Sequence, residues 1–364
     1  TKAVNAHQSW LETKLLPSAR GIFRIGEELY DKKLAADLNS SLSRADILAR
    51  AEKALREVRA QMYDLSKQVY VAEYPYTAFP ENVSPAYQQA IIRSALEVAY
   101  REQPPRDRIV EAARESLARC TEFVRARQLV EIPPDPVEII VMPEFRRGVS
   151  LAYCDSPGPL DVGQKTFYAV SPLPSDWTEK QIQSFLREYN TRSLANLTIH
   201  EAMPGHFLQL ALSNRHPSLL RRVLASGVFI EGWAVYTEQV MAAEGFRGDD
   251  PLMKIIALKW YLRGIANAII DQRIHAGRMS RDEAMRLMIE DTFQEEREAA
   301  AKWVRAQLTS AQLSTYFVGT QEHWDLRRAV EAQQGDAFSL RDYHDRLLSY
   351  GSPPVRYVRQ LMLK

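Results

Sequence analysis

Most of this 364-residue chain carries apolar residues at three- and four-residue steps, and this helical spacing constrains the fold more than any other feature. Ser43 precedes the clearest example, a single apolar stripe along one long amphipathic helix. Helical patterns return over 85–102 and 107–129. The prolines between these two runs lack an amide hydrogen and therefore separate them. The stripe comprises Ile47, Ala51, Ala54, Leu55, Val58, Met62, Leu65 and Val69.

One segment, 131–175, departs from the helical pattern. It opens with a proline-rich run and contains three short runs of strand-like composition, at 138–142, 149–153 and 166–170. From Glu179 to the C-terminus the helical pattern returns. We therefore expect a mainly α fold with a small antiparallel β-sheet beside the active-site cleft.

No flexible linker divides the chain, so we expect one domain over 1–364. It would comprise a helical subregion (1–130), the β patch (131–175) and the helices that carry the site (176–364). The chain begins with threonine rather than methionine, and we expect it to be the C-terminal part of a longer precursor. The compartment, cytoplasmic or exported, and the oligomeric state stay open.

Charge and composition exclude several classes of function. The 47 basic and 46 acidic residues nearly cancel, so no bulk positive field favours nucleic-acid binding. The two cysteines cannot build a disulfide scaffold or a cysteine-only metal site. No apolar run approaches the roughly 18 residues that a membrane span requires.

Two of the seven histidines, His200 and His206, lie in the run H-E-A-M-P-G-H at 200–206. A histidine followed by glutamate and then by a second histidine is typical of zinc hydrolases. The imidazoles bind Zn²⁺, and the glutamate, here Glu201, takes a proton from the water that the metal activates.

The spacing between these histidines differs from the common H-E-x-x-H form. There the second histidine lies about 400° further around the helix, on nearly the same face. Six residues give about 600°, which would leave the rings about 120° apart on a regular helix. Pro204 and Gly205 favour a break, so we predict a bulge or tight turn at 203–205 that returns His206 to His200. On a regular helix, both histidines would be ordinary polar residues.

Two glutamates, Glu231 and Glu238, lie seven residues apart in an otherwise apolar helix that follows the histidines. Buried carboxylates need a partner. We predict that Glu231 is the third metal ligand and that Glu238 orients a ligand histidine through a hydrogen bond. Salt bridges to the many arginines are the alternative for both.

Other candidate residues carry a weaker signal. His275 lies late in a helix, where the helix dipole alone favours a histidine. Alternatively, it could donate to the tetrahedral intermediate or to the substrate carboxylate, or replace His206 as a metal ligand. Arg305 and Arg327 could clamp a substrate carboxylate, with surface ion pairing as the alternative. Tyr168, in the third strand-like run, is a further candidate for substrate binding.

Three residues have a non-catalytic interpretation. His323 and His344 are predicted to be loop or surface residues. Cys154 lies beside the expected cleft, but no histidine–cysteine pattern supports a thiol nucleophile.

The segments 200–209 (H-E-A-M-P-G-H-F-L-Q) and 231–238 (E-G-W-A-V-Y-T-E) resemble the bacterial family catalogued as domain of unknown function 885. The hallmark of that family is H-E-x-x-P-G-H-x-x-Q followed by E-G-W-A-x-Y-x-E. The resemblance continues at 271–275 and 312–319 and spans nearly the whole chain. Ser310-Ala311, where the family has Pro-Gly, leaves the shape of that loop and the substrate preference open.

That family is itself similar to helical zinc peptidases of the Taq carboxypeptidase and thimet oligopeptidase types, which carry H-E-x-G-H. Deleting Met203-Pro204 would leave H-E-A-G-H. The resemblance implies a multi-helix metallopeptidase-like body with a short sheet edge for an extended peptide. It also implies that the phenol of Tyr316 donates a hydrogen bond to the developing oxyanion. Asp271 would position another residue of the site and would not itself contact the metal or the substrate.

The leading hypothesis is therefore a zinc metallopeptidase that acts on a peptide or small amide substrate. The alternative is a catalytically inactive protein that binds a peptide or ligand in a peptidase-like cleft, because the inserted pair has spoiled the metal geometry. A third hypothesis is a metal enzyme that acts on a non-peptide amide or ester.

Overall fold

The computed structural model describes residues 1–147 and 151–364, and its fold is mainly α, as predicted. The helices of the first part are α1 (Lys2–Trp10), α2 (Leu16–Ser18), α3 (Glu27–Leu38), α4 (Arg44–Glu73), α5 (Pro85–Tyr100) and α6 (Ile109–Arg127). The strands are β1 (Val137–Val141), β2 (Ala152–Asp155) and β3 (Thr166–Val170). The helices that follow are α7 (Glu179–Glu188), α8 (Thr191–Glu201), α9 (His206–Ser213), α10 (Leu219–Val223), α11 (Gly227–Ala243), α12 (Pro251–His275), α13 (Arg281–Arg286), α14 (Glu296–Leu308), α15 (Ser314–Gln334), α16 (Leu340–Leu348) and α17 (Val355–Met362).

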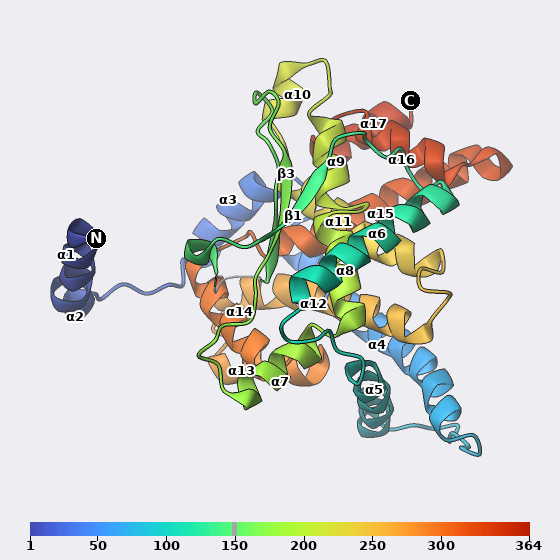
Figure 1. Ribbon diagram of the computed structural model, residues 1–364, viewed down its shortest axis with the longest axis horizontal. Coiled ribbons are helices and arrows are strands. Elements are labelled where there is room, and N and C mark those ends of the chain that lie inside the picture. The colour runs from blue at the N-terminus through green and yellow to red at the C-terminus, as the bar shows by residue number, and fades with distance from the viewer. Residues whose placement is uncertain (148–150) are drawn as a thin grey trace.

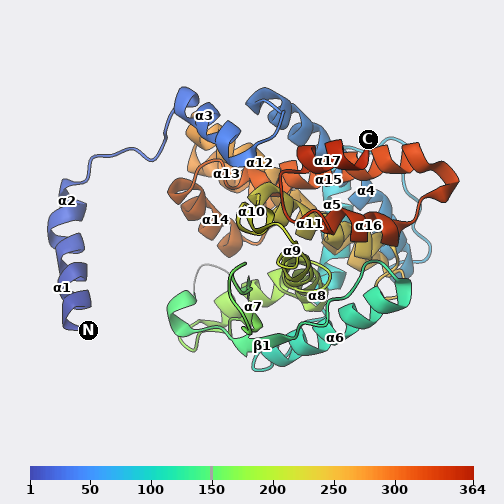
Figure 2. The ribbon, with the colours of Figure 1, turned by 90° about the horizontal axis from the view of Figure 1, so that it is seen from above.

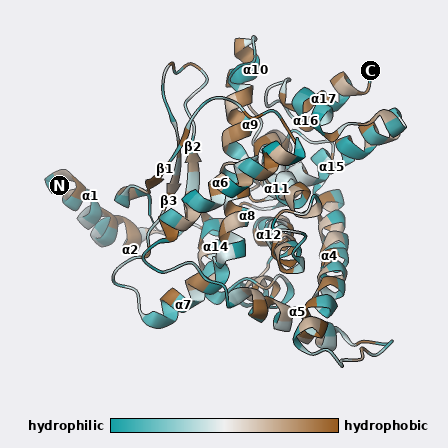
Figure 3. Ribbon diagram, turned by 45° about the vertical axis from the view of Figure 1, so that its right-hand side comes forward, coloured by the Kyte–Doolittle hydropathy of each residue, from teal (hydrophilic) through white to brown (hydrophobic). Residues whose placement is uncertain are grey.

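The long helix predicted after Ser43 is α4. The Ser43 side chain accepts from the Asp46 amide and the Asp46 carboxylate accepts from the Ser43 amide, so a capping box starts the helix. Most of the apolar stripe is buried against α5 and α12, and hydrophilic and hydrophobic colours alternate along α4 in Figure 3. The helices α5 and α6 confirm the predictions over 85–102 and 107–129.

The sheet is mixed, so the expected antiparallel sheet is wrong in one of its two pairings. Strand β3 lies in the middle, parallel to β1 and antiparallel to β2. The chain that joins β1 to β3 is long enough for the crossover that a parallel pair requires. Within the predicted run 149–153, Val149 and Ser150 lie outside the described residues, and β2 begins at Ala152.

Helix α12 runs through the centre of the helical body, in contact with α4, α8, α11 and α15. The helices α1 and α2 lie apart from this body at the end of an extended segment (Figures 1 and 2). Within the described part of the chain, no helix combines the length and apolarity needed to cross a membrane.

Helices α11 and α15 approach each other most closely at two glycines, Gly232 and Gly319. A Cβ on Gly319 would lie 2.1 Å from the Val228 carbonyl oxygen, and one on Gly232 would lie 2.4 Å from the Gly319 carbonyl carbon. Only glycine fits at either position, because no side-chain atom can approach backbone so closely. The crossing sets the position of α11, which carries Glu231.

Contrary to the prediction, His323 and His344 are buried, at 0% and 2% exposure. His344 donates from Nδ1 to the Leu129 carbonyl at 2.7 Å and accepts at Nε2 from the Tyr236 hydroxyl at 2.8 Å. Burial lowers the pKa of His344 to about 3 and that of His323 to about 4. Both rings are therefore neutral parts of an aromatic cluster around Trp233.

Gly319→Ala should lower the free energy of unfolding by about 1–3 kcal/mol, because the methyl group overpacks the crossing of α11 and α15. Gly227→Ala is the matched control, since a Cβ there, at the start of α11, meets nothing within 4 Å. Urea unfolding measures both. Equal stability of the two variants would contradict the close crossing.

His344→Gln should make stability less sensitive to acid. Below the usual pKa of 6.5 the unfolded chain binds a proton at His344 that the folded state, with its depressed pKa, does not bind. Stability from this residue is present above pH 6.5 and lost as the pH falls. Between pH 6.5 and 5, the unfolding free energy of the variant should fall less steeply than that of the parent, by up to about 1.4 kcal/mol per pH unit. Parallel curves would contradict the buried neutral imidazole.

Candidate metal centre

The predicted break between the two histidines is present. Helix α8 begins at an Asn190 side chain that accepts from the Arg192 and Ser193 amides, and it ends at Glu201. Helix α9 then begins at His206. The two imidazole rings lie edge to face across the break, with centroids 4.6 Å apart.

Gly205 makes this break possible. A Cβ there would lie 1.9 Å from the His200 carbonyl oxygen, so any other residue would push the turn away from the end of α8. The Gly205 amide donates to the Ile199 carbonyl at 2.9 Å. From α11, Trp233 Nε1 donates to the Pro204 carbonyl oxygen at 2.9 Å. The turn is therefore held by both helices that supply the rest of the site.

Glu231 and Glu238 project from α11 toward these histidines. Glu231 Oε2 lies 3.6 Å from Nε2 of His200 and 3.6 Å from Nε2 of His206. Glu238 Oε1 accepts from His200 Nδ1 at 2.7 Å, and its Oε2 accepts from Asn196 Nδ2 at 2.6 Å. The Glu238 contact places a proton of His200 on Nδ1, so Nε2, which faces Glu231, is the ring atom that could bind a metal.

One atom from each of His200, His206 and Glu231 could bind the same metal ion. The three potential ligand atoms all lie within 4.8 Å of one another. Tetrahedral ligands at about 2.0–2.1 Å from Zn²⁺ lie about 3.3 Å apart, close to the 3.6 Å between Glu231 and each histidine. Glu231 Oε2 is buried and has no hydrogen-bond partner among the described residues. The donor set and its spacing therefore fit a divalent metal.

The electrostatics of the cluster favour a positive charge at its centre. Burial alone would lower the pKa of His200, but contacts with Glu231 and Glu238 raise it well above its usual range. Burial likewise opposes ionisation of Glu231, but both histidines bring the pKa of its carboxyl well below the usual range. A proton supplies this positive charge in the free site, and a divalent cation would replace it.

Glu201 lies beside the cluster and is held by the sheet. Its Oε2 accepts from the Cys154 amide of β2 at 3.0 Å. Burial raises the pKa of Glu201, although His206 and His200 oppose the shift. Burial also raises the pKa of the Cys154 thiol well above its usual range, so Cys154 is no thiolate nucleophile.

A cavity of about 140 Å³ adjoins His200 and Glu201, and Tyr316 and Arg305 also line it. Arg305 Nη2 donates to the Tyr316 hydroxyl at 3.1 Å and to Gln312 Oε1 at 3.0 Å. Five predicted residues thus line one cavity: His200, Glu201, Glu238, Arg305 and Tyr316. His206 and Glu231 adjoin His200 but do not line this cavity.

The structure does not bring His275 and Asp271 to this region. His275 Nε2 donates to the Ala306 and Thr309 carbonyl oxygens, at 2.7 Å each, and its ring stacks on Tyr30. Asp271 accepts from the Tyr30 hydroxyl at 2.9 Å and the Ser314 hydroxyl at 3.1 Å. Asp271 thus ties α12 to α3 and α15, and His275 ties α12 to α14. Neither residue lines the cavity.

Arg327 and Tyr168, both predicted to bind substrate, also lie elsewhere. Arg327 pairs with Glu331 at 2.7 Å and packs over the Trp324 ring. Tyr168 is fully buried in β3, with its hydroxyl 3.3 Å from Thr198 Oγ1. Neither lines the cavity.

Three further residues at the site were not predicted: Asn196, Trp260 and Lys302. Asn196 lies four residues before His200 and therefore on the same helix face, a signal that sequence spacing offers. Trp260 and Lys302 line the cavity from α12 and α14 and carry no such local signal.

The fold is similar to two solved structures. One is a candidate lipoprotein of unknown function from Shewanella oneidensis, with a TM-score of 0.85 and 36% identity over 100% of this chain and 65% of that one. The other is a candidate lipoprotein from Colwellia psychrerythraea, with a TM-score of 0.82 and 23% identity over 99% of this chain and 60% of that one. The chain thus spans less than two thirds of the length of either protein.

A comparison with curated proteins gives no match. The model of one protein family, described as "Bacterial protein of unknown function (DUF885)", matches residues 1–362. Because this match covers nearly the whole chain, the protein belongs to that family of bacterial proteins of unknown function.

Proposed function

We propose that this protein is a zinc-dependent hydrolase, a metallopeptidase that cleaves peptide or other amide bonds. The observation that carries the proposal is the convergence of Glu231 Oε2 with the Nε2 atoms of His200 and His206, beside the carboxylate of Glu201. Two imidazoles and a carboxylate are a ligand set of catalytic zinc sites, which keep a further position open.

In this proposal His200, His206 and Glu231 hold Zn²⁺, and Glu238 with Asn196 keeps the His200 ring in the required orientation. Bound there, Zn²⁺ would lower the pKa of water and polarise the scissile carbonyl. The buried setting of the three residues strengthens these electrostatic effects because little water screens them.

Glu201 is the proposed general base. Its carboxylate borders both the metal cluster and the cavity, and the Cys154 amide holds one of its oxygens. A carboxylate whose pKa is raised by burial is a stronger proton acceptor than an exposed one. It would take the proton of the attacking water and pass it to the leaving amine.

Tyr316 is the proposed donor to the oxyanion that forms at the scissile carbonyl. It lines the same cavity as His200 and Glu201, and Arg305 donates to its hydroxyl oxygen. Because Arg305 donates to the hydroxyl oxygen, the phenol proton can be donated to a different acceptor. Such donors stabilise the transition state when they lie about 3 Å from the developing charge.

Strand β2 supports a peptide substrate rather than a compact one. It is an outer strand that pairs only with β3 among the described strands, and its Cys154 amide points to Glu201. An extended peptide can add to such an edge through backbone hydrogen bonds. The peptide bond would then lie beside the general base.

Glu201→Gln should retain bound zinc and lose at least ~10²-fold in turnover, because it removes only the proton acceptor. Zinc is measured by atomic absorption, and turnover with a mixture of short peptides analysed by mass spectrometry. Glu138→Gln is the control, since Glu138 is exposed on β1 and pairs with Lys165. Loss of zinc from Glu201→Gln would make Glu201 a ligand and overturn its assigned role.

Glu231→Ala should abolish stoichiometric zinc binding, whereas Glu238→Gln should weaken it only by about 10–100-fold. The difference follows from their contacts, because Glu231 faces both Nε2 atoms and Glu238 contacts only Nδ1 of His200. Competition with a zinc chelator measures the affinity, and Glu331→Ala, which removes a carboxylate paired with Arg327, is the control. If the parent protein takes up no zinc at all, the proposed function fails, and a non-catalytic binding role becomes the better hypothesis.

A further inference from the structure

The cavity beside the metal-binding cluster has two chemically different sides. His200 and Glu201 of α8, together with Glu238 of α11, form one side. The other side is cationic and comprises Arg263 on α12 and Lys302 and Arg305 on α14. The polar partners of these three cations decide what the cavity can bind.

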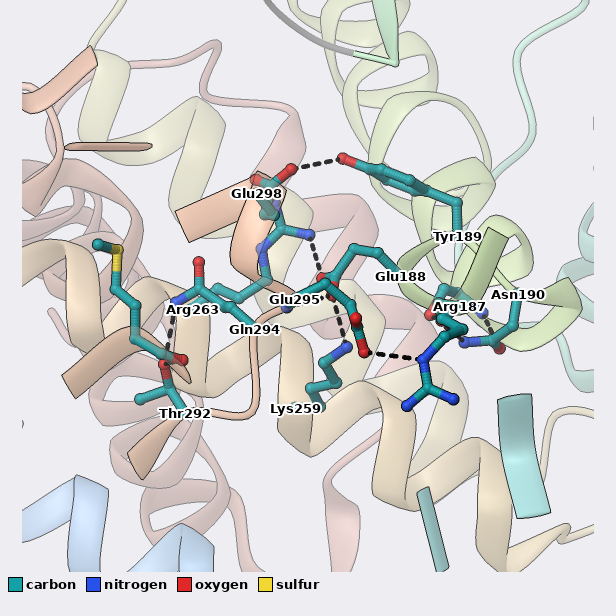
Figure 4. A network of polar contacts seen from close by, with 12 residues as sticks. Arg187, Glu188, Tyr189, Asn190, Lys259, Arg263, Thr292, Gln294, Glu295 and Glu298 are labelled. Atoms are coloured by element: carbon teal, nitrogen blue, oxygen red, sulfur yellow. Dashed lines mark hydrogen bonds and ion pairs between the residues drawn. The ribbon is translucent and has the colours of Figure 1, made fainter. Parts of the chain in front are cut away.

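Arg263 is neutralised inside the protein. It contacts the carboxylates of Glu298 and Glu188, the second at 3.3 Å, and Lys259 contacts Glu188 at 2.8 Å (Figure 4). Tyr189 adds a hydroxyl that donates to Glu298 at 3.2 Å. Both carboxylates of this network are therefore engaged by residues other than Lys302 and Arg305.

Lys302 and Arg305 have no such partner. Among the described residues, no carboxylate oxygen lies within 4.0 Å of the Lys302 ammonium or the Arg305 guanidinium. The Lys302 side chain makes no hydrogen bond to these residues, whereas Arg305 donates only to Gln312 and Tyr316. Lys302 is only 7% exposed. Trp260 Nε1, which also lines the cavity, has no acceptor among the same residues. The wall thus holds several buried donors and an excess of positive charge.

A buried ammonium group without a counter-ion is costly, so the arrangement calls for an anion from outside the chain. Burial, followed by repulsion from Arg263, lowers the pKa of Lys302 to about 7. Attraction to Glu298 and Glu188 opposes this shift, and repulsion from Arg305 adds to it. An anion in the cavity would offset the repulsion and raise the pKa of Lys302, which would restore its charged ammonium form.

We propose that this cavity binds a carboxylate of the substrate against Lys302 and Arg305, with its scissile bond directed to Glu201 and the metal-binding cluster. The inference rests on the proposed hydrolase function and narrows its substrate class to peptides with a carboxylate close to the bond that is cleaved. The carboxylate is either the C-terminus of the peptide or the side chain of an Asp or Glu residue. At about 140 Å³, the cavity accommodates one such group and not a long peptide.

The test measures equilibrium binding to zinc-free protein by NMR titration, so that neither the metal nor turnover contributes. The probes are N-acetyl-Ala-Ala, its C-terminal amide, and N-acetyl-Ala-Glu with an amidated C-terminus. The parent protein should bind at least one carboxylate probe about 10–100-fold more tightly than the uncharged amide, as expected for charge-assisted hydrogen bonds. The carboxylate probe that binds more tightly identifies the C-terminus or the side chain as the source.

Lys302→Met should remove most of this preference and leave binding of the uncharged amide unchanged. Methionine has a similar length and avoids burying a charge, so the variant should remain folded, as its thermal unfolding will report. Lys180→Met, at an exposed lysine of α7, is the matched control. Equal binding of acid and amide by the parent, or an unchanged preference in Lys302→Met, would overturn the proposal. Failure of the proposed function would instead show as absent zinc binding or turnover, which these titrations do not measure.

Discussion

The site depends on one backbone contact, the closure of the turn after α8 against the end of that helix. The Gly205 amide donates to the Ile199 carbonyl, and the space beside the His200 carbonyl has no room for a Cβ. This contact closes a bulge between α8 and α9 and brings His206 beside His200. Trp233 then ties the turn to α11, the helix that brings Glu231 between the two imidazoles. Helix α11 in turn owes its position to the glycine crossing with α15.

Buried charge organises the surroundings of this turn. On one side, carboxylates exceed fixed cations, and Glu231 and Glu238 surround His200 and favour a cation between them. On the other side of the adjoining cavity, cations exceed carboxylates at Lys302 and Arg305. Opposite charge excesses on two walls of one small cavity would orient a polar substrate, because rotating it would place each of its charged groups against a like charge.

Sequence spacing predicted those parts of the site whose geometry is local. The break at 203–205 follows from proline and glycine between two histidines, and the shared face of Glu231 and Glu238 follows from helical periodicity. Contacts between distant segments decide the positions of residues whose surroundings local spacing does not predict. Asp271 ties α12 to α3, and His275 ties α12 to α14. His344 is buried by Leu129 and Tyr236, which lie far away along the chain. The residues adjacent in sequence do not indicate which distant segment a side chain will contact.

The sequence by itself determined the mainly helical fold, the positions of α4, α5 and α6, and the break that brings His200 and His206 together. These features depend on periodicity, capping and proline or glycine geometry, which act over about one helical turn or less. The tertiary structure decided the parallel pairing of β1 with β3, the burial of the cationic wall and the meeting of α8, α11, α12 and α14 around one cavity. Those features arise because packing joins segments far apart in the chain, where burial and long-range charge outweigh local preference.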